Sequence, residues 1–316
     1  MSQKIKKRLG FLCIILFSKI TYADPWFTGP ILAPAGHTIP RGHTNLEVYG
    51  LDVFTNGQYN SSGHVISVPL FKSIIVNPLV THGFTDWMDF QLSVPYAFNS
   101  TQEVNYNRIT DTAAGIGIQL VEQKKHQYLP DLRLFIQETF PTGKYEELNP
   151  QLLGTDATGL GSYRTQVALN FQYLAELFNL HYLRTRLMLS HLYSSPVHVM
   201  GFNSFGGSEI TNGTVNSGAE NNVDLAFEYT LTQNWVAVME GYYSQGQSSI
   251  FNGILDDIHS GRALPLSDKY YEVGLAPALE YNFTSNVGVI GGVWFPVAGK
   301  NTSHFLTYVL AINAYW

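Results

Sequence analysis

The chain has 316 residues, a formal net charge of −6, 45% apolar residues and only 13% charged residues. Collagen-like and intrinsically disordered chains are excluded, because the first needs a strict glycine repeat and the second a highly charged, weakly apolar composition. Soluble domains usually contain about a quarter charged residues, yet the mean hydropathy of −0.02 is too low for a helical membrane protein. A transmembrane β-barrel explains both values, since only every second residue of its strands faces lipid.

The first residues predict a secretory signal peptide. A basic stretch at 4–8 precedes an apolar run at 9–17, and the small-residue site at 21–23 ends in Ala23. As a membrane anchor, the apolar run is about half the ~20 residues that a spanning helix needs. We therefore assign 1–23 to a signal peptide. Its removal takes away Cys13, the only cysteine, and makes the chain more acidic, so we expect no nucleic-acid partner.

The remaining chain divides into a lead-in and a barrel. Residues 24–44, here named the lead-in, are rich in Pro and Gly and show no periodicity; they could lie in the periplasm or enter the barrel as a partial plug. Residues 45–316 contain twelve segments with period-two alternation or β-rich composition. These segments are 45–54, 65–80, 87–98, 113–123, 131–141, 161–174, 181–193, 221–231, 234–246, 268–282, 286–297 and 304–316.

The alternation predicts strands with one lipid face. In 182–191, leucines and a threonine share one face, whereas two arginines, a methionine and a serine share the other. The segment 270–281 repeats the pattern with aromatic residues at both ends, as in the aromatic girdle of a membrane strand. The last segment ends on Trp316, and a terminal aromatic residue of this kind resembles the signal that the outer-membrane insertion machinery reads.

The connections support an antiparallel transmembrane β-barrel of about 12 strands. Those after the first, third, fifth, seventh and ninth segments are long, and those after the even-numbered segments to the tenth are short. Outer-membrane barrels alternate short periplasmic turns with long external loops, which places both termini in the periplasm of a Gram-negative bacterium. A soluble β-sandwich or lipocalin-like barrel is the alternative, but its strands would be shorter and its outward face charged.

The inward faces predict two walls of opposite charge. The basic wall comprises Arg133, Arg164, Arg184 and Arg186. The acidic wall comprises Glu47, Asp89, Asp224, Glu228, Glu240, Glu272 and Glu280. These charges could pair as a rigid network or stand apart around a water-filled constriction.

No motif predicts catalysis. The sequence lacks a Gly-x-Ser-x-Gly elbow, a His-Glu-x-x-His motif and a phosphate-binding loop, so we expect no enzyme and no cofactor. His37 and His43 lack a third ligand at a recognisable spacing, so we expect no metal site. His191 and Ser194 prompt comparison with outer-membrane lipid hydrolases, but they also fit a strand-end histidine and a loop serine.

Several turn and loop segments resemble the MetA-pathway phenol-degradation family of outer-membrane proteins. They are 129–132 (LPDL), 141–145 (PTGKY) and 154–161 (GTDATGLG), with 29–40 and 84–90 also similar. The resemblance implies a barrel that passes small molecules across the outer membrane, in some cases near genes for the breakdown of aromatic compounds. It implies no catalytic residues.

Three classes of function follow. The first is an outer-membrane channel or uptake protein for small solutes, with apolar or aromatic molecules as candidates. The second is a structural or adhesive surface barrel with a closed lumen, and the third is an outer-membrane lipid hydrolase. The partners expected are outer-membrane lipid, the insertion machinery and a small-molecule solute.

Overall fold

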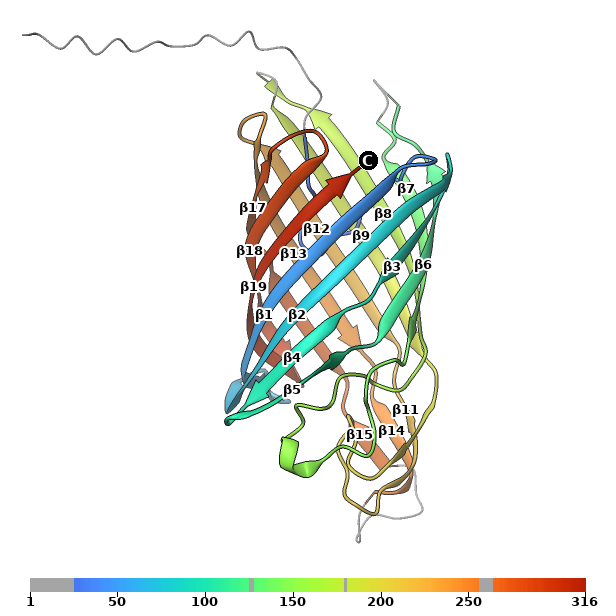
Figure 1. Ribbon diagram of the computed structural model, residues 1–316, viewed down its shortest axis with the longest axis vertical. Coiled ribbons are helices and arrows are strands. Elements are labelled where there is room, and N and C mark those ends of the chain that lie inside the picture. The colour runs from blue at the N-terminus through green and yellow to red at the C-terminus, as the bar shows by residue number, and fades with distance from the viewer. Residues whose placement is uncertain (1–25, 125–127, 179–180, 256–263) are drawn as a thin grey trace, which may run out of the picture.

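The computed structural model describes residues 26–124, 128–178, 181–255 and 264–316. Within these residues the chain is all-β, and twelve antiparallel strands form a closed barrel (Figure 1). β1 pairs with β2 on one side and β19 on the other, which closes the sheet. The predicted signal peptide at 1–23 lies outside the described residues.

Most strands cross the barrel without a break. They are β1 (Thr44–Tyr59), β2 (Val65–Thr85), β7 (Asp131–Phe140), β8 (Arg164–Glu176), β9 (Tyr182–Ser194), β12 (Glu220–Thr230), β13 (Trp235–Gly246), β18 (Val287–Lys300) and β19 (Thr302–Tyr315). The others are interrupted: β3 (Met88–Ser93) continues as β4 (Tyr96–Thr101), β5 (Val104–Ile109) as β6 (Thr112–Val121), and β16 (Tyr270–Leu275) as β17 (Ala278–Asn282). Pro95 and Pro277 lie at two of these breaks, because proline has no amide to donate to a neighbouring strand.

The two faces of the strands differ as the alternation predicts. On β12, Leu225 and Phe227 are exposed on the outer surface, whereas Asp224 and Glu228 are buried inside. The same outward exposure recurs on β19 at Leu310 and Ile312. An apolar exterior over closed antiparallel strands is suited to lipid. Among the described residues, no helix is long and apolar enough to cross a membrane.

The connections differ in length between the two ends of the barrel. At the end that carries the C-terminus, they include 86–87, 231–234 and 283–286. At the opposite end, 141–163, 195–219 and 247–269 are long, whereas 60–64, 102–103 and Asn301 are tight turns. The prediction of long connections after the first and third strands is therefore wrong. β1, β4 and β5 extend beyond the range of clear alternation and absorb the residues that were assigned to loops.

The long connections contain further strands. β10 (Val197–Met200), β11 (Asn212–Asn216), β14 (Ser249–Ile254) and β15 (Leu264–Ser267) form a second, four-stranded sheet beyond the barrel end (Figure 1). This sheet, referred to below as the cap sheet, has its own core of Val197, Val199, Val215 and Phe251. Part of the long connections is therefore ordered by apolar packing.

The 141–163 connection contains two segments of the family resemblance, 141–145 and 154–161, and carboxylates stabilise its fold. Asp111 accepts hydrogen bonds from the amides of Gly143 and Leu160, at 3.0 and 2.9 Å. Lys144 forms a 2.8 Å ion pair with the buried Asp156. A short 3₁₀ turn, η1 (Pro150–Leu152), lies between these contacts.

The described part of the lead-in lies inside the barrel, at the end that carries the C-terminus. Ile31 packs in a core with inward-facing apolar residues of β13, β18 and β19, including Val236, Ile290 and Val309. Gly36 approaches the wall so closely that an added Cβ would lie 2.6 Å from Gln172. The lead-in is thus in van der Waals contact with the barrel wall.

A charge on the outer surface should be costly if that surface faces lipid. Leu310 is 59% exposed near the middle of β19, so we expect Leu310→Arg to lower the free energy of unfolding by about 2–4 kcal/mol. The measurement is urea unfolding in lipid vesicles. Met200→Arg in the cap sheet is the matched control and should change stability by less than about 0.5 kcal/mol. Equal losses in both variants would contradict a lipid-facing β19.

Candidate functional site in the barrel lumen

A buried ion-pair cluster connects β9 and β12. Arg184 lies opposite Glu228 in the strand register, so the two side chains share the inner face. The Arg184 guanidinium donates two hydrogen bonds to the Glu228 carboxylate, one of them 2.6 Å long from Nε. Arg186 Nε lies 3.3 Å from the same carboxylate. One carboxylate therefore holds two like charges together, and the Phe27 ring of the lead-in stacks 4.1 Å from the Arg184 guanidinium.

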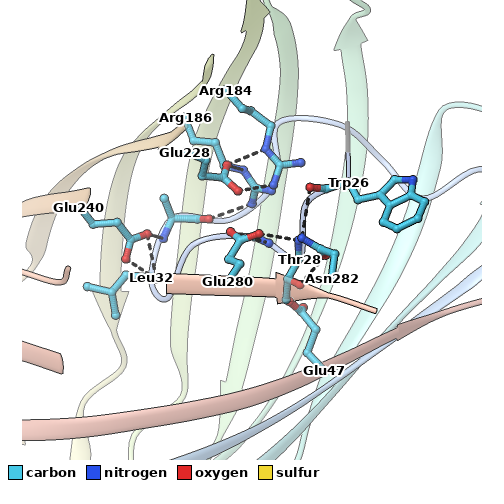
Figure 2. A network of polar contacts seen from close by, with 12 residues as sticks. Trp26, Thr28, Leu32, Glu47, Arg184, Arg186, Glu228, Glu240, Glu280 and Asn282 are labelled. Carbon is cyan, nitrogen blue, oxygen red and sulfur yellow. Dashed lines mark hydrogen bonds and ion pairs between the residues drawn. The ribbon is translucent and has the colours of Figure 1, made fainter. Parts of the chain in front are cut away.

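Two further carboxylates hold the backbone of the lead-in (Figure 2). Glu240 accepts hydrogen bonds from the amides of Leu32 and Ala33 at 3.0–3.1 Å. Glu280 accepts from the amides of Thr28 and Gly29, at 2.8 and 3.3 Å. Both carboxylates are fully buried, so bulk water does not compete for their hydrogen bonds.

Arginine and asparagine side chains complete this hold from the same wall. Arg186 donates to the carbonyl of Ala33 at 3.1 Å, and Asn282 donates to the carbonyl of Trp26 at 3.2 Å. Asn282 also accepts a hydrogen bond from the Thr28 hydroxyl at 3.0 Å. The lead-in is thus bound mainly through its backbone, with acceptors and donors supplied by the barrel.

A second set of contacts holds the far end of the lead-in. Asp89 accepts from the Ile39 amide at 3.0 Å and from Arg133 at 2.5 Å. Gln119 accepts from the Thr38 amide at 2.7 Å and donates to the Gly36 carbonyl at 3.1 Å. Asp89 and Arg133 are both buried, so their pairing neutralises two charges inside the barrel.

The remaining predicted lumen residues have other partners. Arg164 pairs with Glu220 at 3.1 Å, where both side chains are about one quarter exposed. Glu272 accepts from the hydroxyls of Tyr242 and Thr302, at 2.5 and 2.8 Å.

Glu47 and Asp224 differ in their surroundings. Glu47 accepts a 3.2 Å hydrogen bond from the Tyr49 hydroxyl. Asp224 is buried on β12, and within the described residues its Oδ1 has no hydrogen-bond partner.

Each of the four predicted arginines is therefore in an ion pair. Arg133, Arg164, Arg184 and Arg186 pair with carboxylates on adjacent or next-but-one strands, so the charges are matched locally along the wall. Glu240 and Glu280 instead contact backbone amides. The sequence does not identify Gln119, Asn282 and Glu220 as partners, because their roles depend on long-range contacts that leave no local pattern.

His191 and Ser194 do not form a catalytic pair. His191 is exposed on the outer face of β9 and contacts Asn221 at 2.9 Å, whereas Ser194 is buried on the inner face. Residues on opposite faces of a strand cannot act on one substrate atom. Trp316 is 60% exposed, and its backbone exchanges hydrogen bonds with Thr44 at 2.8 and 3.0 Å. Its role as an insertion signal stays a prediction.

The lead-in leaves a cavity of about 460 Å³ inside the barrel. The cavity lies between the lead-in and a wall supplied mostly by β1, β2, β18 and β19, and Arg186 of the β9–β12 cluster also lines it. Its lining combines aromatic, aliphatic and amide side chains with the charged side chains of Glu47, Asp89, Arg133 and Arg186. This volume is in the range of pockets that hold small molecules.

The closed barrel, its apolar exterior and its charged interior define a transmembrane β-barrel of the outer-membrane type. The chain belongs to the family described as "Putative MetA-pathway of phenol degradation", whose model matches residues 71–312. The resembling segments from 84 to 161 lie inside this range, and 29–40 lies outside it. No curated protein matches the chain.

Solved structures of outer-membrane proteins are similar to this chain, and the first of the three below shares its fold. The COG4313 outer membrane channel from Pseudomonas putida F1 is 15% identical, with a TM-score of 0.68 over 89% of this chain and 98% of that chain. The NanC porin is 11% identical, with a TM-score of 0.42 over 85% and 98% of the two chains. The toluene transporter TodX of Pseudomonas putida is 12% identical, with a TM-score of 0.37 over 87% and 90%.

The shared carboxylate of the β9–β12 cluster should be important for stability. Glu228→Gln removes the charge that Arg184 and Arg186 share, and breaking a buried ion pair typically costs about 3–5 kcal/mol. Urea unfolding of the refolded protein measures the loss. Glu220→Gln, at a quarter-exposed pair, should cost less than about 1 kcal/mol. If the Glu228 variant lost no more than this control, the cluster would not be a stabilising network.

The stability of the contacts between the lead-in and the barrel should also depend on pH, because His37 of the lead-in is titratable. Its pKa is raised by a hydrogen bond to Asp131, opposed by burial and supported by the charges of Asp131, Glu122 and Asp89; Nδ1 lies 3.4 Å from the Asp131 carboxylate. Protonated His37 therefore stabilises the folded state. This contribution is complete below the unfolded pKa of about 6.5 and is lost as pH rises through the folded pKa.

The measurement is urea unfolding of the parent protein and of His37→Gln over a range of pH. The free energy of unfolding of the parent should exceed that of the variant most at about pH 5.5, and this difference should be smaller at about pH 8.5. An advantage that grew with pH would refute the assigned sign.

Proposed function

We propose that this barrel is an outer-membrane channel or uptake protein for the passive passage of small solutes, with apolar and aromatic molecules as the preferred class. The observation that carries the proposal is the cavity of about 460 Å³ inside the barrel, beside the lead-in. Membership of a family named for phenol degradation supports aromatic solutes. The shared fold of an outer membrane channel is consistent with the proposal.

The lead-in acts in this proposal as a partial plug. Glu240 of β13 and Glu280 of β17 hold its amides, and Ile31 packs against β18 and β19. The cavity lies beside it, with most of its wall from β1, β2, β18 and β19. Solutes would pass beside the lead-in, and the hydrogen bonds between the lead-in and the barrel wall would set the width of the path.

The proposed role is not enzymatic. The placement of His191 and Ser194 on opposite faces removes the residues that prompted the lipid-hydrolase alternative. The exterior would contact outer-membrane lipid, and the C-terminal strand with Trp316 would be read by the insertion machinery. A small-molecule solute remains the proposed ligand.

A surface barrel with a closed lumen is the second candidate. The cap sheet favours it, because long connections that fold around their own apolar core can present a fixed surface. In that case the paired charges and the lead-in would serve stability, and the function would reside outside the barrel.

Single-channel conductance in a planar bilayer separates the two candidates. The double variant Glu240→Ala and Glu280→Ala removes the acceptors for four lead-in amides, so we expect the lead-in to loosen and conductance to rise severalfold. Glu220→Gln, away from the lead-in, is the control. A folded barrel that gave no conductance in either form would reject the channel and favour the surface barrel.

A further inference from the structure

The cavity beside the lead-in has an apolar and aromatic wall on both sides. Tyr49 and Leu51 of β1, Leu79 of β2 and Trp294 of β18 line the barrel side. Phe27, Ile31 and Leu32 line the side formed by the lead-in. Walls of this composition suit the apolar ring of a small molecule.

Most polar groups around the cavity are already engaged. Arg133 pairs with Asp89, and Arg186 contacts Glu228 and the Ala33 carbonyl. Among the amides, Asn313 donates to Asn45 at 2.9 Å, and Asn77 accepts from Ser93 at 2.8 Å. These groups therefore have few unused donors, acceptors or unpaired charges for a bound molecule.

Glu47 differs from these residues. Its carboxylate lines the cavity and accepts a hydrogen bond of 3.2 Å from the Tyr49 hydroxyl and a second one from the Asn313 amide. Among the described residues, no lysine or arginine lies within ion-pair distance of Glu47. A carboxylate has about four acceptor positions, so Glu47 can accept further donors.

We propose that this cavity binds one small, uncharged, ring-sized molecule that carries a hydroxyl donor. The ring lies between Tyr49, Leu79 and Trp294 and the lead-in, and the hydroxyl donates a hydrogen bond to Glu47. A role of this site in passage across the membrane rests on the proposed channel function. Binding at the site depends only on the cavity.

The proposal makes a prediction about charge and donors. A hydrogen bond to a carboxylate is stronger than one to a neutral acceptor, so a hydroxylated ring should bind better than the same ring with a methyl group. A ring with a carboxylate should be repelled by Glu47, because the two arginines that line the cavity are already paired with Asp89 and Glu228. Phenol, toluene and benzoate therefore serve as matched probes.

Calorimetric titration of the refolded full barrel with the three probes tests the site. We expect phenol to bind saturably, toluene to bind about tenfold more weakly and benzoate to show no binding. Glu47→Gln, which has nearly the same shape, should weaken phenol about tenfold, leave toluene unchanged and admit benzoate. Equal binding of all three probes, or a Glu47→Gln variant with parent selectivity, would overturn the proposal.

A second pair of variants tests the location. Leu79→Trp fills the cavity and should abolish phenol binding, whereas Val80→Trp, on the lipid face of the same strand, should leave it intact. Heat-modifiable migration of each variant on a gel confirms that it has folded. Phenol binding that survived Leu79→Trp in a folded barrel would place the site elsewhere.

Phenol flux into vesicles that contain the barrel distinguishes the site from the channel. Saturable binding with no flux would uphold the site and reject passive passage. Flux that Leu79→Trp left unchanged, in the absence of saturable binding, would uphold the channel and overturn the site.

Discussion

The lumen is organised around the need to satisfy the backbone amides of an irregular segment inside a membrane barrel. The lead-in forms no regular secondary structure, and buried amides without acceptors are destabilising. Glu240, Glu280 and Asp89 provide these acceptors, and charged acceptors form the stronger hydrogen bonds. The buried carboxylates and the lead-in therefore stabilise each other, since a carboxylate is costly to bury without donors.

This arrangement also explains how so many charges fit inside a twelve-stranded barrel. The arginines near the lead-in are neutralised by Glu228 and Asp89, and Glu240, Glu272 and Glu280 have amide or hydroxyl donors. The lead-in fills part of the lumen, and the cavity remains beside it, with most of its wall from β1, β2, β18 and β19. Arg133 and Arg186 line this cavity while their charges are paired with Asp89 and Glu228.

The sequence predicts the barrel well because strand alternation is local. Inward and outward faces on β9 and β12 follow from every second residue, and the register of a closed sheet then sets which charges meet. Connection lengths are less predictable, because polar strand ends beyond the lipid resemble loops, as at β4 and β5. The place of the lead-in could not be predicted, because its contacts, such as Thr28 with Glu280, join residues 252 apart in sequence.

Holding the lead-in by its backbone has a consequence for specificity. The amides of Thr28, Leu32 and Ala33 make the contacts to the wall, and amides are common to every residue except proline. The side chains of Phe27, Ile31 and Leu32 also line the cavity. A substitution among them can therefore reshape the cavity while the hydrogen bonds to Glu240 and Glu280 persist. The carboxylates of the barrel wall thus bind the lead-in backbone, whereas the side chains of the lead-in shape the cavity for a solute.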